Sequence, residues 1–232
     1  DSAVAIAEHI GGSTEGFAAM MNQKARDLGC EHTYFITPNG LDAEQGGKIH
    51  STTAYDLAKI ASYAIENDLF VALVGTQQYA FSEKTTGRKF AVNNKDQFLH
   101  MMDGAIGVKT GYTRAAGRIL VSSCTREGRR MIAVTINAPD DWNDHSAMLE
   151  KGFSRYSERQ LVCKGDVLGT QEVAWGTEDK VSLIASEDFS WAMAQGEVIS
   201  IVLPGNGFVY APVSEGQWAG NAHILVDGEK VG

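Results

Sequence analysis

The sequence predicts an α+β fold made of two domains: a first domain that combines helices with an antiparallel sheet, and a small all-β domain after it. Helical patterns with capping residues dominate the first part of the chain, and alternating strand patterns around a hairpin turn follow between residues 106 and 136. Beyond residue 159 the pattern changes to short strands separated by glycine-containing turns. We therefore expect a first domain over residues 1–159 and a second domain over residues 160–232.

Two helices of the first domain are predicted from their ends. Ser13 or Thr14 is a suitable N-cap for a helix that runs toward Gly29, because a side-chain oxygen satisfies a free backbone N–H and glycine readily ends a helix. The pattern Thr53-x-x-Asp56 opens a second helix with alanine and leucine side chains on one side. These helices predict a helical subdomain.

An antiparallel sheet is predicted from three strand-like segments, and a helix follows it. The strands are expected over residues 106–110, 119–124 and 131–136, and the turn Arg126-Glu127-Gly128-Arg129 joins the last two as a hairpin. Residues 140–156 have a helical pattern whose apolar side chains are expected to pack on the sheet. These side chains are Trp142, Met148, Leu149 and Phe153.

The second domain is predicted to consist of short strands. They are expected over residues 167–175, 180–185, 197–203 and 223–226. Asp227-Gly228 is a strong signal for a two-residue hairpin turn, but only four residues follow it, so its return strand is expected to be short.

Composition excludes several classes of function. The 232 residues carry a formal net charge of −9 and are 44% hydrophobic, which suffices for a substantial core. Without clustered Lys and Arg, a nucleic-acid partner is not expected. No apolar run approaches the roughly 18 residues that a membrane span needs, so we expect membrane association only through segments outside this sequence.

The cysteines indicate neither a metal site nor a disulfide framework. Cys30, Cys124 and Cys163 lack metal-ligand spacing and can form at most one internal disulfide. We expect them to be small buried hydrophobic residues.

No metal site is predicted elsewhere. Asp140, Asp141, Asp144 and His145 are close in sequence, but they have no recognised ligand spacing and occupy a polar loop that leads into a helix.

The most informative motif is Lys109-Thr110-Gly111, at the end of the first predicted strand of the sheet. Gly107, Lys109 and Gly111 share one face of that strand, so the face carries one ammonium group and two positions without a side chain. Such positions let an extended peptide pair with the strand edge while Lys109 attracts an anionic group. Taken alone, such a tripeptide is usually a solvated lysine between turn glycines, so the flanking sequence decides.

Other segments, spread over roughly the first two-thirds of the chain, have counterparts in one known family. Residues 17–29 match the pattern F-x-x-x-M-N-x-x-A-x-x-L-G. The remaining matches are Phe35-Ile36-Thr37-Pro38-Asn39-Gly40-Leu41-Asp42, Ser51-Thr52-Thr53-Ala54-Tyr55-Asp56-Leu57-Ala58, Ala116-Gly117 with Leu120-Val121, and Gly152-Phe153. Together with Lys109-Thr110-Gly111, they resemble the low-molecular-mass penicillin-binding proteins of peptidase family S11, the serine-type D-alanyl-D-alanine carboxypeptidases that trim peptidoglycan stem peptides.

The resemblance implies the fold and the chemistry. The first domain is expected to be β-lactamase/transpeptidase-like, with a β-rich domain after it. The implied enzyme removes the terminal D-alanine of peptidoglycan stem peptides through an acyl-enzyme, reacts with β-lactams, uses neither metal nor cofactor, and works outside the bacterial cytoplasmic membrane.

The resemblance also implies the roles of four residues. Lys109 binds the terminal carboxylate of the substrate or of a β-lactam and helps proton transfer, and Thr110 hydrogen-bonds the same carboxylate. Gly111 keeps the strand edge clear. The backbone N–H of Tyr112 is the second donor of the oxyanion hole.

Two motifs of the family, Ser-x-x-Lys and Ser-x-Asn, are absent from the sequence. In the family, Ser-x-Asn precedes a helix that reads much like residues 1–7, so we expect the chain to begin just after that asparagine. The first domain is then incomplete at its N-terminus, and the N-terminal segment of the same protein is an expected partner. Without the serine nucleophile we expect this chain alone to be inactive.

Two alternatives stay open. A class A-like β-lactamase shares the superfold and the Lys-Thr-Gly strand, but the appended β domain and the flanking pattern argue against it. A non-catalytic protein that binds the cell wall or another partner on the same fold is the other alternative.

Overall fold

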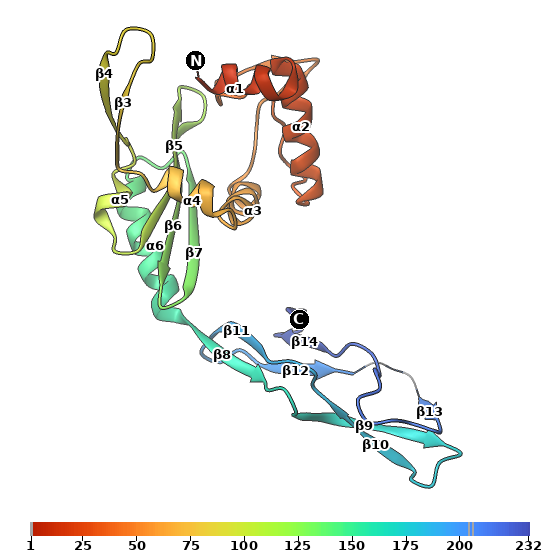
Figure 1. The fold of residues 1–232 in the computed structure, drawn as a ribbon. Coiled ribbons are helices and arrows are strands. Elements are labelled where there is room, and N and C mark those ends of the chain that lie inside the picture. The colour runs from red at the N-terminus through yellow and green to blue at the C-terminus, as the bar shows by residue number, and fades with distance from the viewer. Residues whose placement is uncertain (1, 204, 206) are drawn as a thin grey trace. The chain divides into compact units, whose positions relative to one another are not determined.

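The computed structural model describes residues 2–203, 205 and 207–232, and the chain divides into two compact units (Figure 1). Unit 1 ends at Phe153 and unit 2 spans Ser154–Gly232. The division falls before the expected boundary at residue 159, because the strand that crosses this boundary, β8 (Tyr156–Val162), pairs with β11 (Phe189–Ala194) of unit 2. The predicted α+β class is confirmed.

Unit 1 combines helices with short and long antiparallel strands. Its helices are α1 (Ser2–Gly11), α2 (Thr14–Asp27), α3 (Ala54–Ala64), α4 (Asp68–Val74), α5 (Phe98–Met101) and α6 (Asp141–Arg155), the last of which ends at the start of unit 2. Its strands are β1 (Glu44–Gln45), β2 (Lys48–Ile49), β3 (Gln78–Ser82), β4 (Lys89–Asn93), β5 (Ala105–Thr113), β6 (Gly117–Arg126) and β7 (Arg129–Ile136).

The two predicted helix starts are confirmed at atomic detail. The Ser13 side chain accepts a hydrogen bond of 2.9 Å from the N–H of Gly16, and Thr53 accepts one of 3.1 Å from the N–H of Asp56. The end of α2 is also as predicted, since Gly29 has a φ of 70° and its N–H donates to a carbonyl of the last turn. Capping residues therefore identify these elements because they satisfy backbone groups locally.

Asp56 ties the loop after α2 to the first turn of α3. Its side chain is almost fully buried, and its Oδ2 accepts hydrogen bonds from the N–H of His32, at 2.9 Å, and from the hydroxyl of Thr33, at 2.8 Å. Hydrogen bonds to a buried carboxylate are stronger than neutral ones, so this residue holds the loop at residues 32–33 against the first turn of α3.

The main sheet of unit 1 has the order β5-β6-β7 and is antiparallel throughout. Its strands are longer than predicted, and the predicted hairpin turn is present, with φ of 50° at Glu127 and 77° at Gly128. Lys109 lies opposite Val121 and Thr110 opposite Leu120. Among the described strands, β5 and β7 each have a free edge.

Helix α6 covers one face of this sheet, as predicted. Its buried residues follow one another at intervals of four, which places them on one side of the helix. They are Asp141, His145, Leu149 and Phe153. The core cluster consists of Phe98, Met102, Cys124, Ala133, Leu149 and Phe153, with Trp142 packed against it. Met148 is 42% exposed, so its predicted packing is wrong, because it precedes the buried residue by one position.

The cysteines are free thiols with different surroundings. Cys30 and Cys124 are buried as predicted, and burial raises the pKa of both thiols. Cys163 is exposed, which contradicts the prediction, because it lies in the turn that follows β8.

Unit 2 is built from strands. They are β8, β9 (Val167–Ala174), β10 (Lys180–Ile184), β11, β12 (Ile199–Val202), β13 (Phe208–Tyr210), β14 (His223–Val226) and β15 (Glu229–Lys230). They form the sheets β8-β11, β10-β9-β13 and β12-β14-β15. The Asp227-Gly228 hairpin is present, with φ of 49° and 84°, and its return strand is short as predicted. None of the helices in the described part of the chain is both long and apolar enough to cross a lipid bilayer.

A buried histidine connects α6 to the sheet. His145 is fully buried, with Nδ1 2.5 Å from the hydroxyl of Ser122 on β6 and Nε2 2.9 Å from the hydroxyl of Thr135 on β7. Burial lowers the pKa of His145 to about 4. The imidazole is therefore neutral at pH 7 and bonded at both ring nitrogens.

We expect His145 to make the fold sensitive to acid. In the unfolded chain a histidine has a pKa of about 6.5, so between that value and about 4 the unfolded state binds more protons and stability falls as the pH falls. Relative to a His145→Gln variant, the free energy of unfolding should drop by about 2 to 3 kcal/mol between pH 7 and pH 4.5. Urea unfolding of the chain, or of a longer form that contains it, measures the free energy of unfolding of the parent and of the variant. Parallel pH profiles for the two proteins would contradict the lowered pKa of His145.

Candidate active site

The four residues singled out by the sequence lie together on β5, at the edge of the sheet that no other described strand covers. Lys109 and Gly111 are exposed, Thr110 is half-buried and the Tyr112 residue is 71% exposed. By strand alternation Lys109 shares its face with Val121, on the side of the sheet away from α6.

The backbone of β5 turns hydrogen-bonding groups toward this open edge. Ala138 donates to the carbonyl of Arg118 at 3.3 Å, so that carbonyl points away from β5. Arg118 lies directly opposite Tyr112, and the two therefore form a non-hydrogen-bonded pair, in which both residues turn their N–H and C=O outward. The same holds two residues earlier for Thr110. The edge thus offers the N–H groups of Thr110 and Tyr112 to an added strand.

The two glycines of the strand have different roles. Gly107 is buried with a φ of 118°, and a Cβ there would meet the Val74 side chain of α4 at 3.0 Å, so the fold itself calls for glycine. The prediction that Gly107 belongs to an open face is wrong. At Gly111 a Cβ would make only ordinary contact, 3.6 Å from Ile119. Packing among the described residues therefore does not require glycine at 111, as it does at 107.

A buried carboxylate lies near Lys109. Asp96 is 4% exposed, and its Oδ1 accepts a 3.0 Å hydrogen bond from the N–H of Phe98, whereas Oδ2 has no hydrogen-bond partner among the described residues. Burial raises the pKa of Asp96, while the bond from Phe98 and the charge of Lys109 act in the opposite direction. In the structure the Lys109 ammonium contacts the carbonyl of Thr110.

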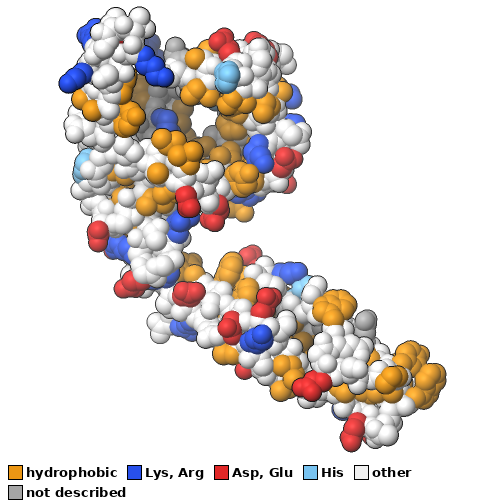
Figure 2. Space-filling model, in the orientation of Figure 1, with side chains coloured by type: hydrophobic (Ala, Val, Ile, Leu, Met, Phe, Trp, Pro, Cys, Tyr) orange, Lys and Arg blue, Asp and Glu red, His pale blue; other side chains and the backbone are white. Residues whose placement is uncertain are grey.

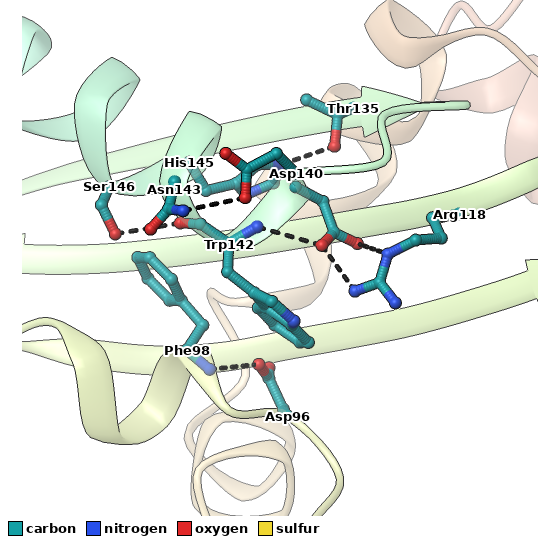
Figure 3. A network of polar contacts seen from close by, with 10 residues as sticks. Asp96, Phe98, Arg118, Thr135, Asp140, Trp142, Asn143, His145 and Ser146 are labelled. Carbon is teal, nitrogen blue, oxygen red and sulfur yellow. Dashed lines mark hydrogen bonds and ion pairs between the residues drawn. The ribbon is translucent and has the colours of Figure 1, made fainter.

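The guanidinium of Arg118, at the start of β6, is held in one orientation near the end of β5 (Figure 3). Asp141, at the start of α6, accepts two hydrogen bonds from Arg118, 3.1 Å from Nε and 2.6 Å from Nη2, and its side chain is 4% exposed. The Trp142 ring lies 5.7 Å from the Arg118 guanidinium. Bidentate pairing and stacking fix the orientation of an arginine, and 42% of the Arg118 side chain remains exposed.

Lys109 and the Arg118–Asp141 pair border a cleft of about 480 Å³, which Asp96 does not line. It is lined by Lys95, Gln97, Lys109, Thr110, Gly111, Tyr112, Arg118, Ile119, Asp141 and Trp142. Sequence reasoning did not identify Arg118 or Asp96 as site residues. The sequence signal for Arg118 was the tight turn between β5 and β6, because a short turn sets Arg118 opposite Tyr112. In this turn the N–H of Ala116 donates to the Thr113 hydroxyl at 3.0 Å.

No metal-binding cluster of three or more His, Cys, Asp or Glu side chains exists among the described residues. Asp141 instead pairs with Arg118, and His145 lies between two hydroxyl groups. Asp140 accepts a hydrogen bond from Asn143 in the first turn of α6.

Two family models match the chain. Residues 1–140 match the D-alanyl-D-alanine carboxypeptidase model, and residues 156–232 match the C-terminal domain of penicillin-binding protein 5. Among curated proteins, D-alanyl-D-alanine carboxypeptidase DacF of Bacillus subtilis is 32% identical over 99% of this chain and 59% of its own length. DacC of Escherichia coli is 30% identical over 100% of the chain and 57% of its own length. The chain thus spans a little over half the length of these relatives.

Solved structures of similar fold also belong to penicillin-binding proteins and D-alanyl-D-alanine carboxypeptidases. Penicillin-binding protein 5 of Haemophilus influenzae superposes with a TM-score of 0.71 at 26% identity, over 99% of this chain and 66% of that one. The D-alanyl-D-alanine carboxypeptidase of Mycobacterium tuberculosis superposes with a TM-score of 0.59 at 31% identity, over 66% of this chain and 58% of that one. On the family match, the motif and the fold, this chain belongs to the S11 family of D-alanyl-D-alanine carboxypeptidases.

Proposed function

We propose that this chain forms part of a serine-type carboxypeptidase that removes the terminal D-alanine of peptidoglycan stem peptides and is acylated by β-lactams. The open edge of β5, with the backbone groups of Thr110 and Tyr112 turned outward, is the observation that carries the proposal. The proposed place of action is outside the cytoplasmic membrane, where such peptides are cross-linked.

The substrate adds to β5 as an extended strand beside Gly111. Its terminal carboxylate binds the ammonium of Lys109 and the hydroxyl of Thr110, and the exposed part of the Arg118 guanidinium, whose charge Asp141 balances, borders the same cleft. The N–H of Tyr112 donates to the oxyanion that forms when the scissile carbonyl is attacked, a contribution of about 3 to 4 kcal/mol in such sites.

The nucleophile comes from outside this chain. Its sequence contains no Ser-x-x-Lys and no Ser-x-Asn, so we assign the serine that forms the acyl-enzyme, and its activating lysine, to a segment that precedes residue 1 in the complete protein. Water then hydrolyses the acyl-enzyme and releases the shortened peptide.

The same segment is a packing partner in this proposal. The edge of β7, which the substrate does not use, is free among the described strands. Helices α1 and α3 expose large apolar side chains, with Ile6 57%, Ile10 54% and Tyr55 71% exposed. Soluble monomers rarely expose contiguous apolar surface beyond a few hundred Å².

The match of residues 156–232 to the C-terminal domain of penicillin-binding protein 5 favours a carboxypeptidase over a class A-like β-lactamase. The open strand edge beside Gly111 would equally suit a non-catalytic binding protein, and acylation of the complete protein by penicillin is the measurement that separates the two.

In the complete protein, Lys109→Ala should slow acylation by penicillin about ten- to a hundredfold, because a charge-assisted contact of about 1.5 to 3 kcal/mol is lost. Lys109→Arg should restore only part of the rate, since a planar fork replaces a compact ammonium. Stopped-flow acylation with a fluorescent penicillin measures the rates, and Lys164→Ala, exposed in unit 2, is the matched control. A parent rate for Lys109→Ala would remove Lys109 from the carboxylate site.

Asp96→Asn should raise stability at pH 7 and slow acylation. Because the folded-state pKa of Asp96 is raised, its charged form destabilises the fold at neutral pH, and the gain from asparagine should disappear as the pH falls below the ordinary carboxyl pKa of about 3.9. Acylation should slow because Lys109 loses the buried negative charge of Asp96, with which it interacts. Thermal unfolding at pH 7 and pH 3.5 and the acylation rate are compared with Asp68→Asn, at an exposed site of α4. Lower stability at pH 7 would contradict the role of the buried charge.

The isolated chain of residues 1–232 should form no covalent adduct with a fluorescent penicillin and release no D-alanine from a diacetyl-Lys-D-Ala-D-Ala peptide. Denaturing gel electrophoresis reads out the label, with the complete protein as the positive control. A labelled residue inside the chain would show that the nucleophile is not upstream.

A further inference from the structure

Unit 2 carries a group of exposed aromatic side chains that the proposed reaction does not use. Trp175, Phe208 and Tyr210, called the aromatic strip here, are 87%, 51% and 56% exposed. The ring centroids of Trp175 and Tyr210 lie 4.9 Å apart, and those of Phe208 and Tyr210 lie 5.2 Å apart. Figure 2 shows hydrophobic side chains gathered at the end of unit 2 that carries β13. Adjacent exposed aromatic rings are typical of a recognition surface.

The aromatic strip stands on the outer face of the sheet β10-β9-β13. β13 runs parallel to β9, with Phe208 beside Glu172 and Tyr210 beside Ala174. Val209, between the two rings, is half-buried on the inner face. Strand alternation thus fixes both rings outward, and the small side chain of Ala174 leaves the face of the sheet open beside Tyr210.

Trp175 presents its ring from a strained backbone. It follows the last residue of β9 with a φ of 62°, in the left-handed region that bulky side chains rarely adopt. The other described non-glycine residues with positive φ are Glu127, Asn137 and Asp227, which are small or polar residues of turns and strand ends. Strain of this kind is concentrated at binding and catalytic sites. The conformation therefore points to a use for the exposed indole.

Hydrogen-bonding groups occupy the other half of the same face. β10 places Lys180 opposite Glu172 and Ser182 opposite Thr170, and all four residues are exposed. The outer face is therefore aromatic along β13 and polar along β10, with the two halves in contact through β9.

We propose that this face binds a chain of β-linked pyranose sugars. A pyranose ring presents C–H groups on its faces and hydroxyl groups at its rim, so one ring stacks on Trp175 or Tyr210 while its hydroxyls bond Glu172, Lys180 and Ser182. Trp and Tyr supply large rigid contact area with little loss of side-chain freedom. The proposal goes beyond the carboxypeptidase reaction and does not depend on it, since every residue named belongs to unit 2.

A lipid surface fits this face less well. Acidic residues outnumber basic ones about two to one over residues 154–232, and Glu172, Glu178 and Asp179 flank the aromatic strip in sequence or register. An anionic membrane would be repelled by these carboxylates. The hydroxyl groups of a neutral sugar chain would instead donate hydrogen bonds to these carboxylates.

The test is a titration of the complete protein with the hexamer of β-1,4-linked N-acetylglucosamine, by calorimetry and tryptophan fluorescence. Saturable binding is expected. Trp175→Gly removes the ring and also relieves the positive φ, so the variant should fold at least as well as the parent and bind at least tenfold more weakly. Trp191→Ala, 41% exposed on β11, is the matched control and should bind within twofold of the parent.

Two results would overturn the proposal: no saturable binding by the parent, or equal binding by Trp175→Gly. If the first result came together with Trp175-dependent binding to phosphatidylcholine vesicles, it would assign the aromatic strip to lipid. Carboxypeptidase activity is measured in parallel, and Lys109→Ala should bind the hexamer like the parent. An inactive protein that still binds the hexamer would count against the proposed reaction alone.

Discussion

The antiparallel register between β5 and β6 is the constraint on which the candidate site depends. Thr110 and Tyr112 turn their backbone groups to the open edge only because Tyr112 and Arg118 form a non-hydrogen-bonded pair. A slip of one residue would turn these groups into the sheet and move Lys109 to the face covered by α6. The register is held by the tight turn after Thr113 and by the burial of β6, whose central residues include the fully buried Leu120.

Helix α6 serves both the core and the site through residues spaced by four. At its start, Asp141 holds the guanidinium of Arg118, and one turn later His145 binds hydroxyls of two strands. Leu149 and Phe153 then fill the apolar core. A single helix face thus changes from charged to polar to apolar along its length. The packing of the far end positions the charged end, because side chains in a close-packed core leave a helix little freedom to slide or rotate.

The elements fixed by neighbouring residues could be predicted from the sequence, and those that depend on pairing with distant residues could not. The caps Ser13 and Thr53 and the turns at Glu127 and Asp227 satisfy backbone groups within a few residues, so the sequence alone identifies them. β8 and β11 were not predicted, since β8 is mostly exposed and polar and is a strand only through its pairing with β11. The site follows the same rule. Lys109 to Tyr112 are contiguous, whereas Arg118 and Asp141 reach the cleft from other elements.

The open edge of β5 has a consequence for self-association. An unpaired strand edge invites a second copy of the same strand, and natural proteins often prevent such pairing with a charged side chain, most often lysine. If two copies of β5 met edge to edge in antiparallel fashion around Lys109, they would place their Lys109 ammonium groups directly opposite each other, without a carboxylate on either strand to compensate them. A ligand with a terminal carboxylate supplies the compensation that a second copy lacks. The lysine would therefore allow a short anionic peptide onto this edge while keeping the edges of neighbouring molecules apart.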